Sequence, residues 1–267
     1  MKISVLLALT LLTSLCSCRT DKEDGDSDGV DTTACGVIGL DERVAYPRII
    51  NGTECSEVDS PVVQLTMLFN EGLIGSCSGT LISADAILTA AHCFSVDDEP
   101  CLSVSARVEG RDKEVSKVVL HPEADVPQND VAIVFLSKSV STPTLPLALS
   151  APMQPKDIIS VFGFGVDQDQ IGGVLRSGQM RVVGLNSQNI QAKFQEKNSN
   201  VCYGDSGGPA VLTFKNEGGD EVSGIVGITS FGNSSGCSVG ESVFFANVQN
   251  VSISDFIKRE VPQVKIE

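Results

Sequence analysis

Short apolar runs separated by turn-forming residues follow one another after Arg48, and they limit the fold more than any other feature. Each run is four to eight residues long and is bounded by Gly, Ser, Asn, Asp or Pro, a pattern typical of β-strands. The sequence therefore predicts an all-β fold. The expected strands lie at 61–68, 78–82, 86–89, 115–120, 131–136, 158–162, 178–183, 209–214, 222–228 and 242–246.

These strands form two sets on either side of residues 143–155, which contain four prolines and suit an extended linker. One helix is expected after the second set, at about 252–260, with Ser252 or Ser254 as its N-cap. A chain of 267 residues is long enough to bury one large core or two small ones. The pattern predicts two packed β-barrels followed by a helix.

The first 18 residues are expected to be a signal peptide. Met1 and Lys2 precede an apolar run at 3–12, which is typical of a secretory signal and too short to favour a membrane span. Residues 15–18 read Leu-Cys-Ser-Cys, which is similar to the end of a bacterial lipoprotein signal with Cys18 as the lipidated residue. Ordinary cleavage nearby is the alternative, because a cysteine at Cys16 is atypical of that motif.

An acidic segment at 19–48 follows the signal and is expected to be a tether or a propeptide. Residues 19–33 have almost no apolar side chains, so they cannot bury enough surface to offset chain entropy and should be disordered. The Asp-rich stretch at 24–29 lacks the remainder of an EF-hand calcium loop. The net charge of −15, part of which lies in this tail, argues against a nucleic-acid partner.

One polar loop contains a candidate nucleophile. Residues 204–209 read Gly-Asp-Ser-Gly-Gly-Pro. A serine needs a base to remove its proton and backbone N–H groups that stabilise the oxyanion. The glycines on both sides of Ser206 allow the unusual backbone that such a turn requires.

The chain has 2 histidines, and both precede Ser206. This excludes the order of an α/β-hydrolase, in which the histidine comes last, and leaves the order His, Asp, Ser. His92 is the candidate base, and Asp130, at the head of an apolar strand, is the candidate acid. His121 precedes Pro122 and has no matched partner, so we interpret it as a strand-end residue.

These motifs carry a resemblance to a known family. Residues 89–93, 129–132 and 204–209 resemble the three catalytic motifs of the chymotrypsin/trypsin-like serine peptidases, and residues 48–52 resemble their activation site. The resemblance covers the chain from about Ile49 to its end. It implies two packed six-stranded antiparallel β-barrels, at about 49–142 and 156–250, with the active site between them. The chain has no tryptophan, and Gly163-Phe164-Gly165 stands where the family usually has Gly-Trp-Gly.

The resemblance also implies a role for each site residue. Ser206 would be the nucleophile, His92 the base and Asp130 the group that orients the imidazole, with the N–H groups of Gly204 and Ser206 as the oxyanion hole.

Asp205 would act as a switch. A buried carboxylate needs a cation, which the family supplies by cleavage between Arg48 and Ile49, because the new α-amino group pairs with this position.

The 9 cysteines and the signal favour an exported, disulfide-bonded protein. The resemblance pairs Cys77 with Cys93, and Cys202 with Cys237. Cys35, Cys55 and Cys101 remain, and the sequence does not decide their pairing. A bond from Cys35 to either of the other two would keep the propeptide attached after cleavage.

Alignment on Cys202 and Ser206 places Asn200 at the base of the specificity pocket, where trypsin-like enzymes have an aspartate. Because an uncharged asparagine at the bottom of the pocket cannot pair with a basic side chain, the sequence predicts cleavage after large neutral residues. The walls match Ser230, Gly232 and Ser242, and Glu241 is an alternative acid that would restore a preference for basic residues.

The calcium loop of some family members would fall between Val108 and Val118, a segment too short to wrap a cation. We expect neither a metal nor a cofactor.

The sequence thus predicts a secreted or envelope-tethered serine endopeptidase made as a zymogen. The expected partners are polypeptide substrates, an activating protease and protein inhibitors, with membrane contact only through a lipid anchor. An inactive binding relative is the alternative, although such proteins typically lose a triad residue and none is lost here. An esterase with the same acyl chemistry is disfavoured by the order of the three residues.

Overall fold

The structure is a computed structural model that describes residues 34–43, 52–97, 99–167, 171–194, 201–233, 237 and 241–267. All of them belong to the unit formed by residues 31–267. The predicted signal and tether up to residue 33, including Cys18, lie outside the described residues, as do Arg48, Ile49 and Asn200. No helix of the described residues is both long enough and apolar enough to cross a membrane.

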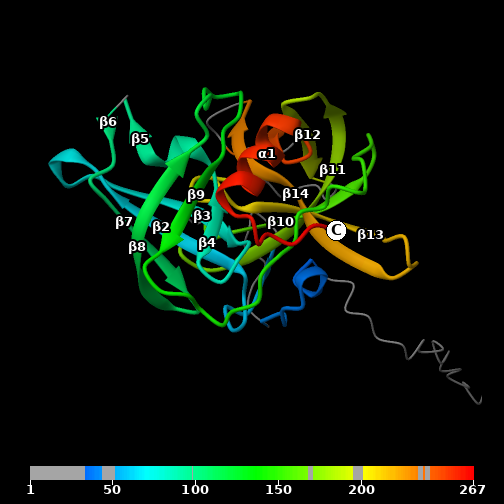
Figure 1. Cartoon of the computed structure of the whole chain (residues 1–267), viewed down its shortest axis with the longest axis horizontal. Helices are drawn as coiled ribbons and strands as arrows, with labels where there is room; N and C mark the ends of the chain where they lie inside the picture. Colours follow the sequence, from blue (N-terminus) through cyan, green and yellow to red (C-terminus); the bar gives the residue numbers. More distant parts are fainter. Residues whose placement is uncertain are drawn as a thin grey trace, which may run out of the picture. The chain divides into compact units, whose positions relative to one another are not determined.

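The first barrel is a closed ring of six antiparallel strands in the order β2-β3-β4-β9-β8-β7 (Figure 1). Its interior is filled by the apolar side chains of the expected runs, such as Leu65, Ile87 and Ile133, which are fully buried. The strands are β2 (Val62–Leu68), β3 (Ile74–Leu81), β4 (Ala86–Thr89), β7 (Ser103–Val108), β8 (Arg111–Leu120) and β9 (Ala132–Leu136).

The second barrel also contains six antiparallel strands, in the order β11-β10-β13-β14-β15-β12, and a pairing between β11 and β12 closes it. A short strand, β1 (Thr53–Glu54), joins this sheet at β11. The predicted two-barrel, all-β fold is therefore confirmed. The strands are β10 (Ile158–Gly163), β11 (Arg176–Leu185), β12 (Asn189–Phe194), β13 (Pro209–Lys215), β14 (Glu221–Gly232) and β15 (Val243–Asn247).

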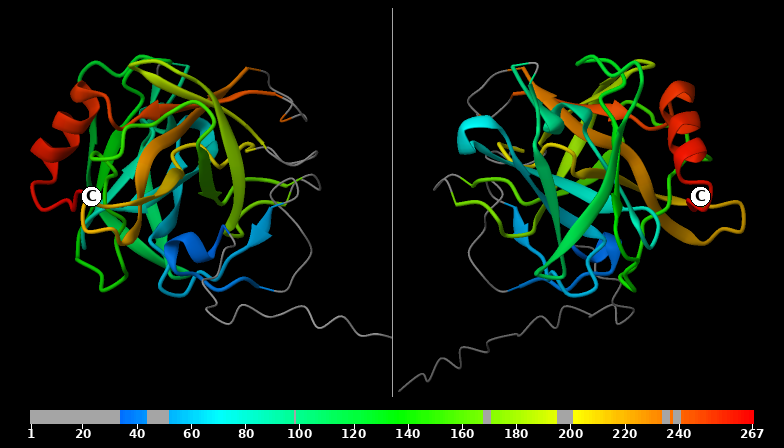
Figure 2. Two further views of the ribbon diagram at one scale, coloured as in Figure 1. Left: turned by 90° about the vertical axis from the view of Figure 1, so that its right-hand side faces the viewer. Right: turned by 60° about the vertical axis from the view of Figure 1, so that its left-hand side comes forward.

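The C-terminal helix α1 (Val251–Glu260) lies at the periphery of the strands (Figure 2). It buries Ile253, Phe256 and Ile257. Asn250 is its N-cap, with a side chain that accepts hydrogen bonds from the amides of Ser252 and Ile253. The expected cap at Ser252 or Ser254 was wrong, because Asn250 is the residue that precedes the first helical turn.

Four short elements complete the described fold. The turn between β7 and β8 has only two residues between paired Val108 and Arg111, so the segment compared with a calcium loop is a tight hairpin. The short elements are η1 (Gly36–Ile38), η2 (Asn70–Gly72), η3 (Ala91–Phe94) and the hairpin formed by β5 (Ser95–Val96) and β6 (Glu99–Pro100).

The segment at 34–43 is packed onto the second barrel beside β1. Cys35 forms a disulfide with Cys55, and both residues are buried together with Leu40. Backbone hydrogen bonds join this segment to the start of the barrel domain, from Arg43 to Glu54 and from Ser56 to Asp41. The open question of the third disulfide is thus answered, and Cys101 is a free, half-buried thiol.

Candidate active site

His92 lies on η3, directly after β4 has crossed the first barrel. Its Nδ1 is 2.7 Å from Oδ2 of Asp130, and its backbone N–H donates to Oδ1 at 2.9 Å. The two contacts fix both the ring and the main chain against one carboxylate. Because Nδ1 is occupied by the carboxylate, Nε2 is left as the nitrogen that can accept a proton.

Asp130 is fully buried and receives a further hydrogen bond from the Ser230 hydroxyl on β14. Burial raises the pKa of Asp130, but the hydrogen bonds and charge of His92, together with the Ser230 bond, outweigh burial and hold the pKa below its ordinary value. The acid is therefore ionised at neutral pH. An ionised acid in this position stabilises the charged imidazole.

The turn that presents Ser206 is held by both barrels. Ser78 on β3 donates through its backbone to the Ser206 carbonyl and through its hydroxyl to the Gly204 carbonyl, both at 2.8 Å. Gly207 has φ of +82° and donates to Thr229 on β14. A Cβ at Gly207 would collide with the side chain of Thr89, so only glycine allows the turn to approach the chain leading to His92.

The backbone N–H groups of Gly204 and Ser206 form no hydrogen bond to the described part of the chain. Gly204 has φ of +97°, a conformation that favours glycine. Two unengaged donors beside a serine hydroxyl can stabilise a developing oxyanion.

Asp205, next to the candidate nucleophile, is buried among backbone groups. Its carboxylate accepts hydrogen bonds from the amides of Gly165 at 2.8 Å and Cys202 at 2.9 Å. Burial raises the pKa of Asp205 to about 6, although the two amides and the charge of Arg176 oppose this shift. A Cβ at Gly163 or Gly165 would collide with the carboxylate, which explains the glycines on both sides of Phe164.

A buried ion pair beside Asp205 was not expected from the sequence. Nη2 of Arg176 is 3.1 Å from Oδ2 of Asp167, and both side chains have exposed fractions of 1% or less. Nη1 of Arg176 donates to the carbonyl of Gly165, the residue whose amide binds Asp205. The ion pair therefore supports the peptide whose amide binds the Asp205 carboxylate.

A cavity of about 190 Å³ opens beside Ser206. It brings together the predicted pocket residues Ser230, Gly232 and Ser242, and it also contains Glu241. Val243, which pairs with Gly232 between β14 and β15, was missed. The full lining is Val201, Cys202, Tyr203, Ser206, Thr229, Ser230, Phe231, Gly232, Cys237, Glu241, Ser242 and Val243.

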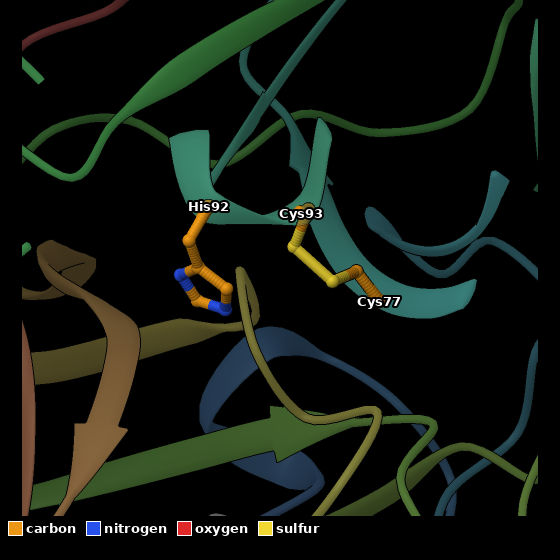
Figure 3. A group of neighbouring side chains, drawn as sticks. All are labelled: Cys77, His92 and Cys93. Atoms are coloured by element: carbon orange, nitrogen blue, oxygen red, sulfur yellow. A yellow bond between two sulfur atoms is a disulfide. The ribbon is translucent and has the colours of Figure 1, made fainter. Parts of the chain in front are cut away.

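Two disulfides brace the site. Cys77–Cys93 joins β3 to η3 beside the His92 ring (Figure 3), and Cys202–Cys237 joins two residues that line the cavity. Ligand atoms of Cys77, His92 and Cys93 lie within 4.8 Å of one another. Because the two sulfurs are bonded to each other, neither offers the thiolate that a metal would bind.

Two closed six-stranded barrels and a C-terminal helix define a protein with the chymotrypsin fold. Residues 49–257 match the model of the trypsin family, so the chain belongs to that family.

Similar proteins agree with this assignment. Cathepsin G of Mus musculus is 29% identical over 216 residues, which cover 71% of this chain and 78% of that protein. The solved structure of HL collagenase has a TM-score of 0.65 at 23% identity and covers 80% of this chain and 99% of its own, a likeness of fold.

Proposed function

We propose that the protein is a serine endopeptidase that hydrolyses peptide bonds in polypeptides through an acyl-enzyme. The hydrogen bond of 2.7 Å between His92 and a fully buried, ionised Asp130 carries this proposal. This hydrogen bond fixes the imidazole tautomer that a general base needs. The turn that carries Ser206 also has two backbone N–H groups, those of Gly204 and Ser206, that bond to nothing in the described part of the chain.

The chemistry follows from these groups. Oγ of Ser206 attacks the carbonyl carbon of the substrate while Nε2 of His92 takes its proton. The N–H groups of Gly204 and Ser206 receive the oxyanion. As the intermediate collapses, His92 gives the proton to the leaving amine, and the acyl group stays on Ser206. Water then attacks this ester with the same assistance from His92, which releases the acid and the serine.

The protein is made as a zymogen that is activated by another protease between Arg48 and Ile49. Support comes from Asp205, whose buried carboxylate receives only backbone amides as hydrogen-bond donors among the described residues. A new α-amino group at Ile49 would supply the missing cation.

The chain after the proposed cut begins its strand pairing beside residues that contact the Asp205 site. Thr53 pairs with Ser177, the neighbour of Arg176, whose guanidinium contacts the Gly165 peptide beside Asp205.

The preferred substrate residue before the cut is large and neutral. Asn200 supplies no charge at the proposed base of the pocket, and Val243 adds an apolar wall. Glu241 lines the same cavity and is the group that would instead attract a basic side chain.

The protein acts outside the cytoplasm, secreted or tethered through a lipid on Cys18. The signal-like residues 1–18 and three disulfides support export.

Activation followed by a substrate library tests the function. The precursor is treated briefly with trypsin, trypsin is inhibited, and a pooled peptide library is assayed before and after. Peptide cleavage and fluorophosphonate labelling should appear only after treatment, and both should be absent in Ser206→Ala. Labelling that survives in this variant would place the nucleophile elsewhere, and an inert treated protein would favour the binding relative.

A further inference from the structure

His121, which the sequence pattern marked only as a strand-end residue, is buried with an exposed fraction of 4%. We propose that His121 is a positioning residue that holds the loop carrying Asp130 and ties it to helix α1. The inference rests on the proposed peptidase function, since it assigns a residue that supports the catalytic acid of that site.

The His121 ring is hydrogen-bonded to the loop at 121–130 that carries Asp130. Nδ1 of His121 accepts a hydrogen bond from the Glu123 amide at 3.1 Å, and the Glu123 carbonyl accepts one from Nδ2 of Asn129 at 3.2 Å. The backbone N–H of His121 donates to the Val131 carbonyl at 2.9 Å. The loop is thus closed on both sides of Asp130, by a side-chain relay to Asn129 and a backbone bond to Val131.

Asn129 shows that this closure holds the backbone in an uncommon conformation. Its φ is +47°, which is uncommon for residues other than glycine, although asparagine adopts it more readily than most. Such a conformation persists only where the surroundings enforce it. The relay through Glu123 is one of the contacts that enforce it immediately before Asp130.

The other ring nitrogen reaches the far end of the chain. Because Nδ1 accepts a hydrogen bond, the neutral ring carries its proton on Nε2. Nε2 lies 3.3 Å from the carbonyl and 3.1 Å from the hydroxyl of Ser252, in the first turn of α1. The ring also packs edge-on against Phe256, with 5.0 Å between centroids.

Residues 186–189 of the second barrel form two hydrogen bonds to the loop that precedes Asp130. Nδ2 of Asn189 donates to the Pro127 carbonyl at 3.0 Å, and Oε1 of Gln188 accepts from the Asn129 amide at 3.4 Å. The loop carrying Asp130 is therefore held at separate points, by His121 against α1 and by Gln188 and Asn189 against the second barrel.

Placement of this kind affects catalysis because Asp130 must meet donors from both barrels. Its carboxylate is hydrogen-bonded to the His92 ring of the first barrel and to the Ser230 hydroxyl of the second. Catalytic groups are sensitive to displacements of about 1 Å. A loop that relaxes would misalign the acid without altering the pocket that binds substrate.

The test compares His121→Phe with His121→Asn in the activated enzyme. Phenylalanine keeps a ring against Phe256 and removes both nitrogens, whereas asparagine retains an acceptor near the position of Nδ1. We expect His121→Phe to lower kcat by about tenfold or more with KM changed less than about twofold. His121→Asn should recover most of the lost kcat. A kcat of His121→Phe equal to that of the native protein, with only thermal stability reduced, would overturn the proposal.

A spectroscopic readout separates this proposal from the peptidase function. The chain has 2 histidines, so in either variant a low-field imidazole N–H signal in the proton NMR spectrum belongs to His92. Its Nδ1–H signal should shift or broaden in His121→Phe and return in His121→Asn, even in protein without activity. An identical signal in both variants contradicts the positioning role. An inactive native protein with the expected NMR pattern contradicts only the peptidase function.

If His121→Phe does not fold, Asn129→Gly replaces it. Glycine accepts the positive φ and removes only the side-chain bond to Glu123. The same loss of kcat is expected, and an unchanged kcat would overturn the proposal.

Discussion

The Ser230 hydroxyl on β14 of the second barrel donates a hydrogen bond to Asp130, which precedes β9 of the first. A hydrogen bond to a charged group contributes about 1.5–3 kcal/mol. Ser230→Ala is therefore expected to lower kcat/KM by roughly ten- to hundredfold. Ser223→Ala is a matched control, because Ser223 lies on the same strand and bonds an exposed threonine. Equal rates for both variants would show that the bond to Asp130 is dispensable.

The same substitution should change acid unfolding. The pKa of Asp130 is held below its ordinary value of 3.8, so its stabilising effect is present above that value and is lost as the pH falls through the lower folded value. Loss of the Ser230 donor raises the pKa of Asp130 toward its ordinary value. The carboxylate is then protonated at a higher pH, so Ser230→Ala should begin to unfold at a higher pH than the native protein. Circular dichroism during acid titration measures this, and an unchanged midpoint would contradict it.

The pH dependence of the uncleaved precursor should have the opposite sign because of Asp205. Its pKa is raised from 3.8 to about 6, so folding disfavours the ionised carboxylate. Stability should decrease as the pH rises from about 4 to about 6, by up to roughly 3 kcal/mol, and then level off. Chemical denaturation of Arg48→Gln, which stays uncleaved, measures the change against the double variant with Asp205→Asn. If the free energy of unfolding changes with pH in the same way in both proteins, Asp205 is not the source of the pH dependence.

Cleavage after Arg48 should leave the segment at 34–48 attached through Cys35–Cys55. The activated protein should run as one band on a non-reducing gel and lose an N-terminal fragment on reduction. The double variant Cys35→Ala, Cys55→Ala should release the fragment without reduction. Release from the native protein under non-reducing conditions would exclude this bond in solution.

Substrate preference should follow the neutral pocket. Matched peptides with Phe, Leu, Arg or Lys before the cut should give the higher kcat/KM for Phe and Leu, and Glu241→Gln should keep that order. Asn200→Asp should raise kcat/KM for Arg by about tenfold or more, because a buried cation then gains a partner. A native preference of about tenfold for Arg or Lys that Glu241→Gln abolishes would assign the pocket to Glu241.

Lipidation of Cys18 should make the mature protein partition into detergent on phase separation. Cys18→Ala should remain in the aqueous phase. If both proteins stay aqueous, plain secretion replaces the tether.

Each of the ten expected strands contains at least two adjacent apolar residues, and each barrel contains one further strand that lacks such a pair. β7 reads Ser-Val-Ser-Ala-Arg-Val, and β12 reads Asn-Ile-Gln-Ala-Lys-Phe. In both, small or polar residues alternate with buried ones such as Ala106 and Ala192. Pairing with neighbouring strands, rather than local hydrophobicity, makes them β-structure.

Local motifs pointed to His92, Asp130 and Ser206, because the chemistry of the proposed peptidase requires particular residues within short segments. Arg176 and Asp167 carry no such signal, since only the fold brings a strand residue to a loop carboxylate. Val243 was missed for another reason. Its place on the pocket wall depends on the register between β14 and β15, which the length of the intervening loop conceals from alignment.

Division of the site between two barrels has a consequence for biosynthesis. His92 and Asp130 belong to the half that is made first, whereas Ser206 and Ser230 lie in the half that is made last. Domains of a nascent chain generally fold in order from the N-terminus. A partly translated chain therefore holds the proposed base and acid but no nucleophile, so the site cannot be complete before the second barrel has been made.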